Sequence, residues 1–298
     1  ASAGSPGVEH GWYTKTETGN SSGKELGQEL WGFIPYQLLP HLKWLTQADY
    51  THVYYVDLKP KVTDVKIFSD DADHPNGWGT ILIGGDLGGG NPAIRNARYT
   101  TVGAGAVLTA DAIDVGAGGR IVTWSDDTTR FAGFLSARGG AAGGNGGFAE
   151  VSGKQHLGMT GHADLSAPQG HAGELLLDPG SVSLVAGNAD PIGTDSFSVG
   201  WLSTQLANSG VTISTANSTN NAAQTITLSA PLSWTSSNTL TLVAGTSISL
   251  NANVTMTGGT LAFSAPQATT IGAVTISGGR LQDNGSAGLV STNFNTIL

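Results

Sequence analysis

Short runs in which apolar and polar residues alternate fill the chain from Gly77 onward. In residues 225–228 and 247–250, Thr or Ser alternates with Ile or Leu. A period of two residues is typical of a strand that buries one face, and β-branched side chains suit it. The same reasoning predicts strands in further short runs at residues 81–83, 106–108, 120–122, 148–151, 175–177, 239–242 and 260–263.

Gly, Asn and Asp residues separate these runs, as turns require. Many short strands that recur at intervals of roughly 20 residues favour a repetitive stack. We therefore predict a mainly β protein, with a right-handed parallel β-helix (β-solenoid) over residues 77–298. About eleven coils, each roughly 4.8 Å high, would form a rod about 50 Å long. A β-sandwich is the alternative, but the tight Asn-Gly turns that it favours occur clearly only at Asn76 and Asn284.

The chain before Gly77 has a different pattern. Residues 24–33 and 36–48 carry Leu and Phe at helical spacing, with prolines that favour short helices. Residues 51–58 and 62–68 then read as two strands around a Lys-Pro-Lys turn. A coil of a β-stack cannot absorb helical periodicity, so this region is predicted to be a small α+β segment of its own.

Composition narrows the function. The 298-residue chain is 39% hydrophobic, which favours folding over disorder, and only 12% charged with 44 glycines. A net charge of −9 gives no electrostatic reason to bind nucleic acid or anionic lipid, whereas a neutral glycan or calcium is easier to accommodate. The absence of cysteine excludes disulfides, thiolate nucleophiles and Cys-type zinc sites. No apolar run approaches the roughly 20 residues of a membrane span.

An ordered series of sequence blocks resembles a known family. Residues 79–86 read Gly-Thr-Ile-Leu-Ile-Gly-Gly-Asp, and the further blocks follow at residues 100–106, 118–131, 136–140, 143–148, 150–153 and 175–179. Together they resemble the filamentous-haemagglutinin-like exoproteins of the two-partner secretion (TpsA) type. The resemblance covers roughly residues 77–264, and several blocks in order are more specific than any single block.

The resemblance implies a secreted adhesin at the cell surface of a Gram-negative bacterium, exported through an outer-membrane transporter of the TpsB type. Residues 1–4 look like the end of a coil whose continuation resumes at Gly77. The predicted organisation therefore has three parts, namely the end of a preceding coil at 1–7, an α+β insertion outside the solenoid at 8–76, and the solenoid at 77–298.

The expected function is attachment to cells, matrix or glycan. The solenoid would be a rigid stalk, and insertion 8–76 the candidate recognition lobe for a host-cell or matrix glycan or a protein receptor. Aromatic rings provide large contact areas on which sugars stack. Most aromatic residues of the insertion are expected to form its own core, and Trp12, Trp44 and Trp78 are the candidate glycan contacts.

One acidic turn is a candidate calcium site, and no other cofactor is expected. Calcium prefers oxygen ligands such as carboxylates. In an EF-type loop, however, Pro75 would occupy a ligand position and Leu82 the position of the final Glu. A solvated turn is the alternative interpretation. The candidate ligands are Asp70, Asp71, Asp73 and Asn76.

We expect no enzymatic activity. Ser21 lies in a nucleophile-elbow pattern, but the polar residues before it make a poor strand. Asp126 and Asp127 are adjacent, so on a strand they would face opposite sides, and a turn is the better interpretation. His156, His162 and His171 have no metal-ligand spacing and are expected to be exposed on one face.

Two alternative functions stay open. Many β-solenoids degrade polysaccharides as lyases or hydrolases, although no paired catalytic constellation is evident and residues 181–298 contain Arg280 as their only Lys or Arg. The chain could also be a purely structural spacer without a ligand. Weak glycan-acceptor patterns occur at Asn20, Asn217 and Asn253.

Overall fold

The chain divides into two compact units, Ala1–Asp64 and Val65–Leu298. A computed structural model describes a set of residues that all belong to the second unit. The predicted segments 1–7 and 8–76 lie outside this set, so the predicted boundary at Gly77 stays a prediction. The described residues are 80–187, 194–217, 224–267, 269–271, 273–285, 289–291 and 294–296.

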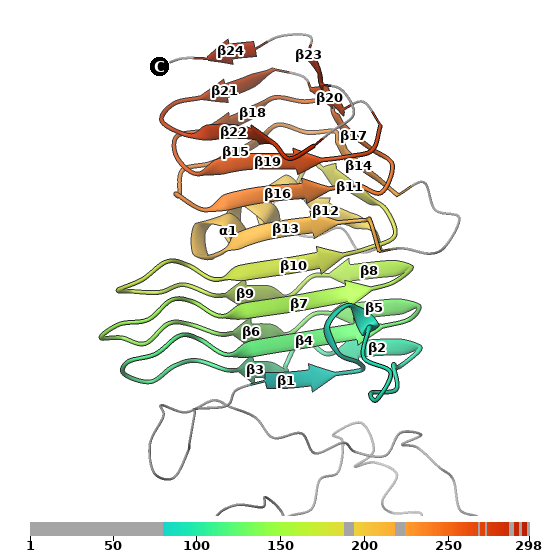
Figure 1. The fold of residues 1–298 in the computed structure, drawn as a ribbon, viewed down its shortest axis with the longest axis vertical. Coiled ribbons are helices and arrows are strands. Elements are labelled where there is room, and N and C mark those ends of the chain that lie inside the picture. The colour runs from blue at the N-terminus through green and yellow to red at the C-terminus, as the bar shows by residue number, and fades with distance from the viewer. Residues whose placement is uncertain are drawn as a thin grey trace, which may run out of the picture. The chain divides into compact units, whose positions relative to one another are not determined.

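The described residues form a mainly β structure with long parallel sheets (Figure 1). One sheet has eight strands and takes up every third strand of the chain. We call it sheet 1 and each successive group of three strands a level. The strands of sheet 1, in spatial order, are β1 (Thr80–Ile83), β4 (Arg120–Ser125), β7 (Phe148–Gly153), β10 (Glu174–Asp178), β13 (Gly210–Ser214), β16 (Thr239–Val243), β19 (Thr260–Ser264) and β22 (Arg280–Asp283).

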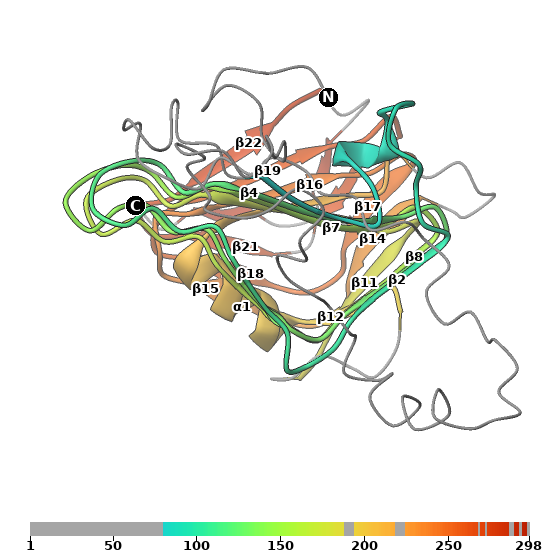
Figure 2. The same ribbon diagram turned by 90° about the horizontal axis from the view of Figure 1, so that it is seen from below.

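The second and third sides of the stack form shorter sheets, which Figure 2 shows from below. The second side consists of β2 (Tyr99–Val102), β5 (Thr128–Phe131) and β8 (His156–Met159), and then of β12 (Ser196–Ser198), β11 (Val182–Val185), β14 (Thr225–Leu228), β17 (Ser247–Leu250), β20 (Thr269–Ile271) and β23 (Leu289–Ser291). The third side consists of β3 (Val107–Thr109), β6 (Phe134–Ser136) and β9 (His162–Asp164), and then of β15 (Leu232–Trp234), β18 (Val254–Met256), β21 (Val274–Ile276) and β24 (Phe294–Thr296).

Rows of aligned side chains build the core. In sheet 1 the register places one apolar residue of each strand directly against an apolar residue of the next. Alternate residues point to opposite faces of a strand, so one face of the sheet supplies these rows and the other face points outward. In one such row the inner members are at most 1% exposed, and they are Ile121, Ala149, Leu175, Val211, Leu240 and Leu261. Ile81 and Leu281 at the two ends of this row are partly buried.

The strand predictions are confirmed, whereas the predicted coil length holds only for the levels whose sheet 1 strands begin at Thr239, Thr260 and Arg280. Each predicted run from Gly77 onward coincides with a strand, and every pair of strands described is parallel, which rules out a β-sandwich here. Strands of sheet 1 begin at Arg120, Phe148 and Glu174, so these levels are longer than the predicted interval. Gly-rich loops at the corners account for the extra length. Sheet 1 therefore has eight strands, where about eleven coils were expected.

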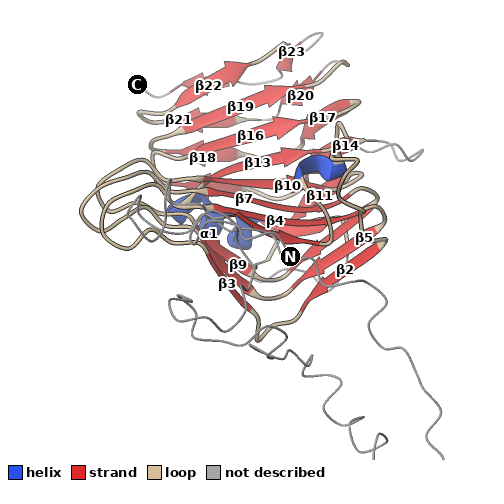
Figure 3. Ribbon diagram, turned by 60° about the horizontal axis from the view of Figure 1, so that its bottom comes forward, coloured by secondary structure: helices blue, strands red, loops and turns tan. Residues whose placement is uncertain are grey.

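A helix that the periodicity did not predict replaces a strand on the third side. Helix α1 (Val199–Asn208) contacts both β9 and β15, and Figure 3 shows it in blue beside the strands. Its first turn is capped by the Ser198 side chain, which accepts a hydrogen bond from the Trp201 amide. Among the described residues, no helix has the length and apolar character that crossing a membrane requires.

Side chains of α1 provide the hydrogen bonds that a strand would have made. The Gln205 Oε1 atom accepts a bond of 2.9 Å from the Ala163 amide of β9. The Ser203 hydroxyl donates at 2.6 Å to the Ser233 carbonyl of β15. Because buried backbone groups need partners, these side chains allow the helix to fill the gap between two sheets. The helix thus keeps the stack continuous at this level.

A pair of substitutions on one strand tests the assignment of inner and outer faces. Leu177 is fully buried in the core, whereas Leu176, its neighbour on β10, is only half-buried on the opposite face. We expect Leu177→Ala to lower the free energy of unfolding by about 3 kcal/mol, because it leaves a cavity. Leu176→Ala should cost clearly less. Urea denaturation followed by circular dichroism measures both, and a larger loss for Leu176→Ala would contradict the assignment.

Candidate functional site: a polar groove on the outer face of sheet 1

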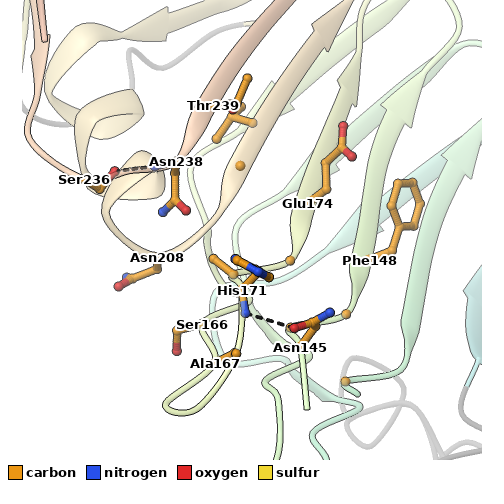
Figure 4. A pocket seen from close by; sticks show the side chains of 18 of the residues that line it. Asn145, Phe148, Ser166, Ala167, His171, Glu174, Asn208, Ser236, Asn238 and Thr239 are labelled. Atoms are coloured by element: carbon orange, nitrogen blue, oxygen red, sulfur yellow. Dashed lines mark hydrogen bonds between the residues drawn. The ribbon is translucent and has the colours of Figure 1, made fainter. Parts of the chain in front are cut away.

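A groove of about 1280 Å³ crosses the outer face of sheet 1 near the starts of its strands (Figure 4). It extends from β4 through β7, β10 and β13 to β16. Its lining combines an aromatic ring, amides, hydroxyls and a few charged groups. The side chains that define its chemistry are Arg120, Asn145, Phe148, His171, Glu174, Asn208, Thr212, Asn238, Thr239 and Thr241.

A change in loop length along the stack creates the groove. Residues 137–147 and 165–173 form long loops before β7 and β10, and these loops extend beyond the sheets on one side (Figures 1 and 2). In the next level, Ser209 alone separates α1 from β13. Long loops beside short ones leave a recess along the sheet. Residues from both long loops and from the end of α1 line it.

The charged groups of the groove already have partners within the protein. The Arg120 guanidinium lies over the Phe148 ring at 5.4 Å from its centroid, an arrangement in which the ring attracts the cation. The Glu174 carboxylate accepts a hydrogen bond of 2.5 Å from the Thr212 hydroxyl. The lining contains one arginine and one glutamate. The groove is therefore nearly balanced in charge, unlike the acidic chain as a whole.

Two glycines in the groove have opposite tolerance for a side chain. A Cβ atom at Gly173 would lie 1.9 Å from the Gly147 carbonyl oxygen, so the two levels touch through their backbones there. A Cβ atom at Gly210 would meet nothing nearer than 3.6 Å, which is ordinary van der Waals contact. Gly210 lies in register with Glu174 and thus leaves a gap in the outward row. A Cβ atom at Gly210 therefore meets no backbone clash.

A second unusual feature lies at the other end of the sheet 1 strands, under the segment 84–98, which we call the cap. Gly88 lies in the cap, and its backbone amide donates to both carboxylate oxygens of Glu150, at 3.2 and 3.1 Å. The cap also packs on Trp124, which is 1% exposed. Asn96 fastens the cap by donating to the Gly89 carbonyl and to Asp126. As a result, Glu150 points outward from the sheet and is nevertheless 0% exposed.

Glu150 has a neighbouring carboxyl group on the next strand. Asp178 of β10 is 2% exposed and accepts a hydrogen bond of 2.7 Å from the Asn217 amide at Oδ2. Its Oδ1 atom has no hydrogen-bond partner in the described part of the chain. Both residues are thus carboxyl groups that folding removes from water.

Burial governs the ionisation of this pair. It raises the pKa of Glu150 to about 7, and the charges of Asp178 and Asp86 add to the rise while the Ser152 hydroxyl and the Gly88 amide oppose it. Burial likewise raises the pKa of Asp178 to about 6, against hydrogen bonds from Asn217 and Ser214. Both carboxyl groups are therefore easier to protonate in the folded protein than in the unfolded chain.

The described structure places some of the predicted site residues and leaves others untested. The glycan candidates Trp12, Trp44 and Trp78 and the catalytic candidate Ser21 lie outside the described residues. The candidate calcium ligands also lie outside the described residues, and they are Asp70, Asp71, Asp73 and Asn76. Within the described ranges, no three His, Cys, Asp or Glu residues come together in a way that could hold a metal ion.

The interpretation of Asp126 and Asp127 as a turn is confirmed, since they connect β4 to β5. Asp126 accepts hydrogen bonds from Asn96 and the Trp124 indole. The hydroxyl of Thr128 lowers the pKa of Asp127 by donating to it at 2.9 Å. Both carboxylates thus stabilise the corner between two strands.

The prediction that three histidines share one face is wrong. His156 lies on β8, His162 on β9 and His171 in the loop before β10, so the first two belong to different sheets. The expected exposure of all three is confirmed. Loops of unequal length separate them, and their spacing in sequence therefore gives no common direction.

Sequence reasoning assigned no role to the groove or to the buried carboxyl pair. Glu150 and Asp178 both lie inside blocks that resemble the exoprotein family. A carboxylate within an apolar strand, as in Phe148-Ala149-Glu150-Val151, is the signal that could have drawn attention to the first. The groove has no such signal, because it depends on loop lengths in neighbouring levels.

No protein-family model matches the chain, and no curated protein matches it. The resemblance to filamentous-haemagglutinin-like exoproteins therefore rests on the sequence blocks and stays a prediction.

The buried carboxyl pair predicts an unusual dependence of stability on pH. Because the pKa of folded Glu150 is raised from 4.5 to about 7, its contribution is fully present below pH 4.5 and is lost as the pH rises through about 7. Asp178 acts in the same direction between pH 3.8 and about 6. The expected loss from Glu150 is on the order of 3 kcal/mol.

The variant Glu150→Gln isolates this effect. Between pH 5 and pH 8, the urea concentration at the unfolding midpoint should fall less for this variant than for the native chain. At pH 8 the variant should be more stable than the native chain, because an amide carries no charge to desolvate. Asp127→Asn, on the exposed corner, is the control and should keep the decline. A Glu150→Gln variant that is less stable than the native chain at pH 8 would contradict the prediction.

Proposed function

We propose that this chain is a segment of a large secreted adhesin of the two-partner secretion type, acting at the surface of a Gram-negative bacterium. In this proposal the parallel sheets form a right-handed β-solenoid that serves as a stalk. The in-register pairing of every third strand supports the solenoid, since it is the topology of successive coils. The handedness follows from the strong right-handed preference of connections between parallel strands.

The observation that carries the attachment function is the groove on sheet 1. A spacer needs only stacked levels and polar outer positions, whereas here unequal loops form a recess of about 1280 Å³. Its ring, amides and hydroxyls are groups that recognise a polar ligand. The insertion 8–76 stays in the proposal as a second recognition element, with a TpsB-type transporter as the export partner. The acidic net charge argues against nucleic acid as a partner.

The carboxyl groups favour binding over cleavage. Hydrolysis of a glycosidic bond usually takes two carboxyl groups that flank the bond. The groove contains one, Glu174, among its lining residues. Glu150 and Asp178 have the raised pKa of a general acid, but at 0% and 2% exposed they are shielded from solvent and lie outside this lining. We therefore propose attachment without turnover.

A bead assay tests attachment and turnover together. Beads coated with the purified chain should attach to cultured epithelial cells, and the soluble chain should compete with them. Polysaccharides incubated with the chain should gain neither reducing ends nor unsaturated uronates. Sugar release that disappears in Glu174→Gln would establish a degrading enzyme instead, and equal attachment of beads coated with albumin would remove the evidence for adhesion.

Removal of the predicted insertion tests the organisation of the chain. Joining Gly7 to Gly77 through a short Gly/Ser linker should preserve β-type circular dichroism, because each level of a stacked protein is stabilised mainly by its neighbours. Beads coated with the same variant show how much residues 8–76 contribute to attachment to cells. A collapse of the β signal would show that these residues belong to the core and that the insertion hypothesis is wrong.

A further inference from the structure

We infer that the groove on sheet 1 is a binding site for a neutral, linear oligosaccharide that lies across successive levels of the stack. The inference deepens the proposed attachment function and rests on it for its biological role. It names the binding site and the class of ligand, which the attachment proposal leaves open. The argument uses the length of the groove, its charge, its single ring and the gap at Gly210.

The length of the groove favours an extended ligand. Its lining comes from five neighbouring strands of sheet 1, namely β4, β7, β10, β13 and β16. Neighbouring strands are about 4.8 Å apart, so the lining spans on the order of 20 Å along the stack. A single sugar would cover only a part of it. A chain of several sugars, with about one ring per level, matches both the length and the repeat.

The charge of the groove favours a neutral ligand. Its arginine is held over the Phe148 ring and its glutamate by the Thr212 hydroxyl, so each charge is partly satisfied inside the protein. A polyanionic glycan would need a cluster of cations, as phosphate and sulfate groups do. Most polar side chains in the rest of the lining are neutral Asn amides and Ser or Thr hydroxyls, which can donate and accept hydrogen bonds with sugar hydroxyls.

The same lining is a poor match for a peptide. Extended peptides are recognised by free sheet edges, apolar grooves or aromatic clefts for proline-rich segments. Here β7, β10 and β13 are each paired on both sides, so they offer no free edge. Phe148 is the one aromatic residue in the lining. A single half-buried ring among polar groups suits the apolar face of a sugar.

Gly210 gives the groove its depth and provides the test. Glu174 lies in register with Gly210 on one side, and Thr239 lies next in the same outward row. The missing side chain at Gly210 leaves the space between them empty. A Cβ atom there would make only van der Waals contacts, at 3.6 Å and 3.7 Å from two carbonyl oxygens. Gly210→Leu should therefore fill the groove and leave the sheet intact.

The experiment measures binding of the full chain to defined oligosaccharides by isothermal titration calorimetry. The probes are cellohexaose, laminarihexaose and N-acetylchitohexaose, with the disaccharide of each and a heparin hexasaccharide for comparison. We expect at least one neutral hexasaccharide to bind, and its disaccharide to bind at least tenfold more weakly because it spans fewer levels. The heparin fragment should bind more weakly than that hexasaccharide.

Three variants locate the site. Gly210→Leu should weaken hexasaccharide binding at least tenfold with an unchanged melting temperature, and Phe148→Ala should weaken it as well. The control is Gly103→Leu, because a Cβ atom at Gly103 has no heavy atom within 4 Å and this residue lies outside the groove. Its binding should equal that of the native chain. Undiminished binding by both groove variants would overturn the inference, as would the absence of binding by every neutral hexasaccharide.

The bead assay with the same variants separates this inference from the proposed function. If beads attach to cells but no hexasaccharide binds, the groove inference fails and attachment stands. If hexasaccharides bind through Gly210 but native beads do not attach, the site stands and the adhesin proposal fails. A heparin fragment, or a peptide mixture, that binds more tightly and loses its binding in Gly210→Leu would overturn the choice of ligand class.

Discussion

Backbone hydrogen bonding between successive levels constrains the rest of this structure. Each strand of sheet 1 gives its amides and carbonyls to the strands above and below in a fixed parallel register. A shift by one residue would move every inward side chain to the outer face. The inward positions of sheet 1 are therefore mostly apolar, although the fully buried Thr123 of β4 stands in the row of Val151 and Leu177. Extra residues can enter only at the corners, where no partner strand is displaced, and the cap and the two long loops all lie there.

This constraint makes the outer face the place where the levels differ. Outward positions of sheet 1 do not contribute to the core, so their chemistry is set by whatever covers them. At one end of the strands the cap buries Glu150 and Trp124 and raises the pKa of a carboxyl group. At the other end the loops stop short of β13 and leave the groove open. One sheet thus carries a sealed acidic pair and an accessible polar recess.

The sequence predicts the strands better than the connections between them. Runs such as Thr225–Leu228 predict a strand from a few residues alone, because apolar and polar residues alternate when one face of a strand is buried. The length of the earlier levels was predicted too short, since the Gly-rich loops before β7 and β10 have no periodicity to measure. Helix α1 was missed because its short segment, which includes Val199, Gly200 and Thr204, has no strong helical propensity. Ser198 as its cap is the one local signal.

The groove and the buried pair were beyond sequence reasoning for a different reason. Phe148 and Glu174 are far apart in the chain and become neighbours only through the register of β7 and β10. Glu150 stands out as a carboxylate within an apolar strand, but its burial follows only from the cap that covers it. The Gly88 amide that contacts it is 62 positions away in the sequence. Such features depend on the pairing of distant segments, which no local pattern reports.

The replacement of a strand by α1 has a mechanical consequence. Between β8 and β12, and between β9 and β15, the strand ladders of the second and third sides are interrupted, whereas sheet 1 continues through the same level. Side-chain contacts of Asp195 and Gln205 join the two blocks where ladders are missing. Under tension along the stack, load at this seam passes mainly through one ladder. Among the described strands, sheet 1 is therefore the one ladder that joins the two blocks.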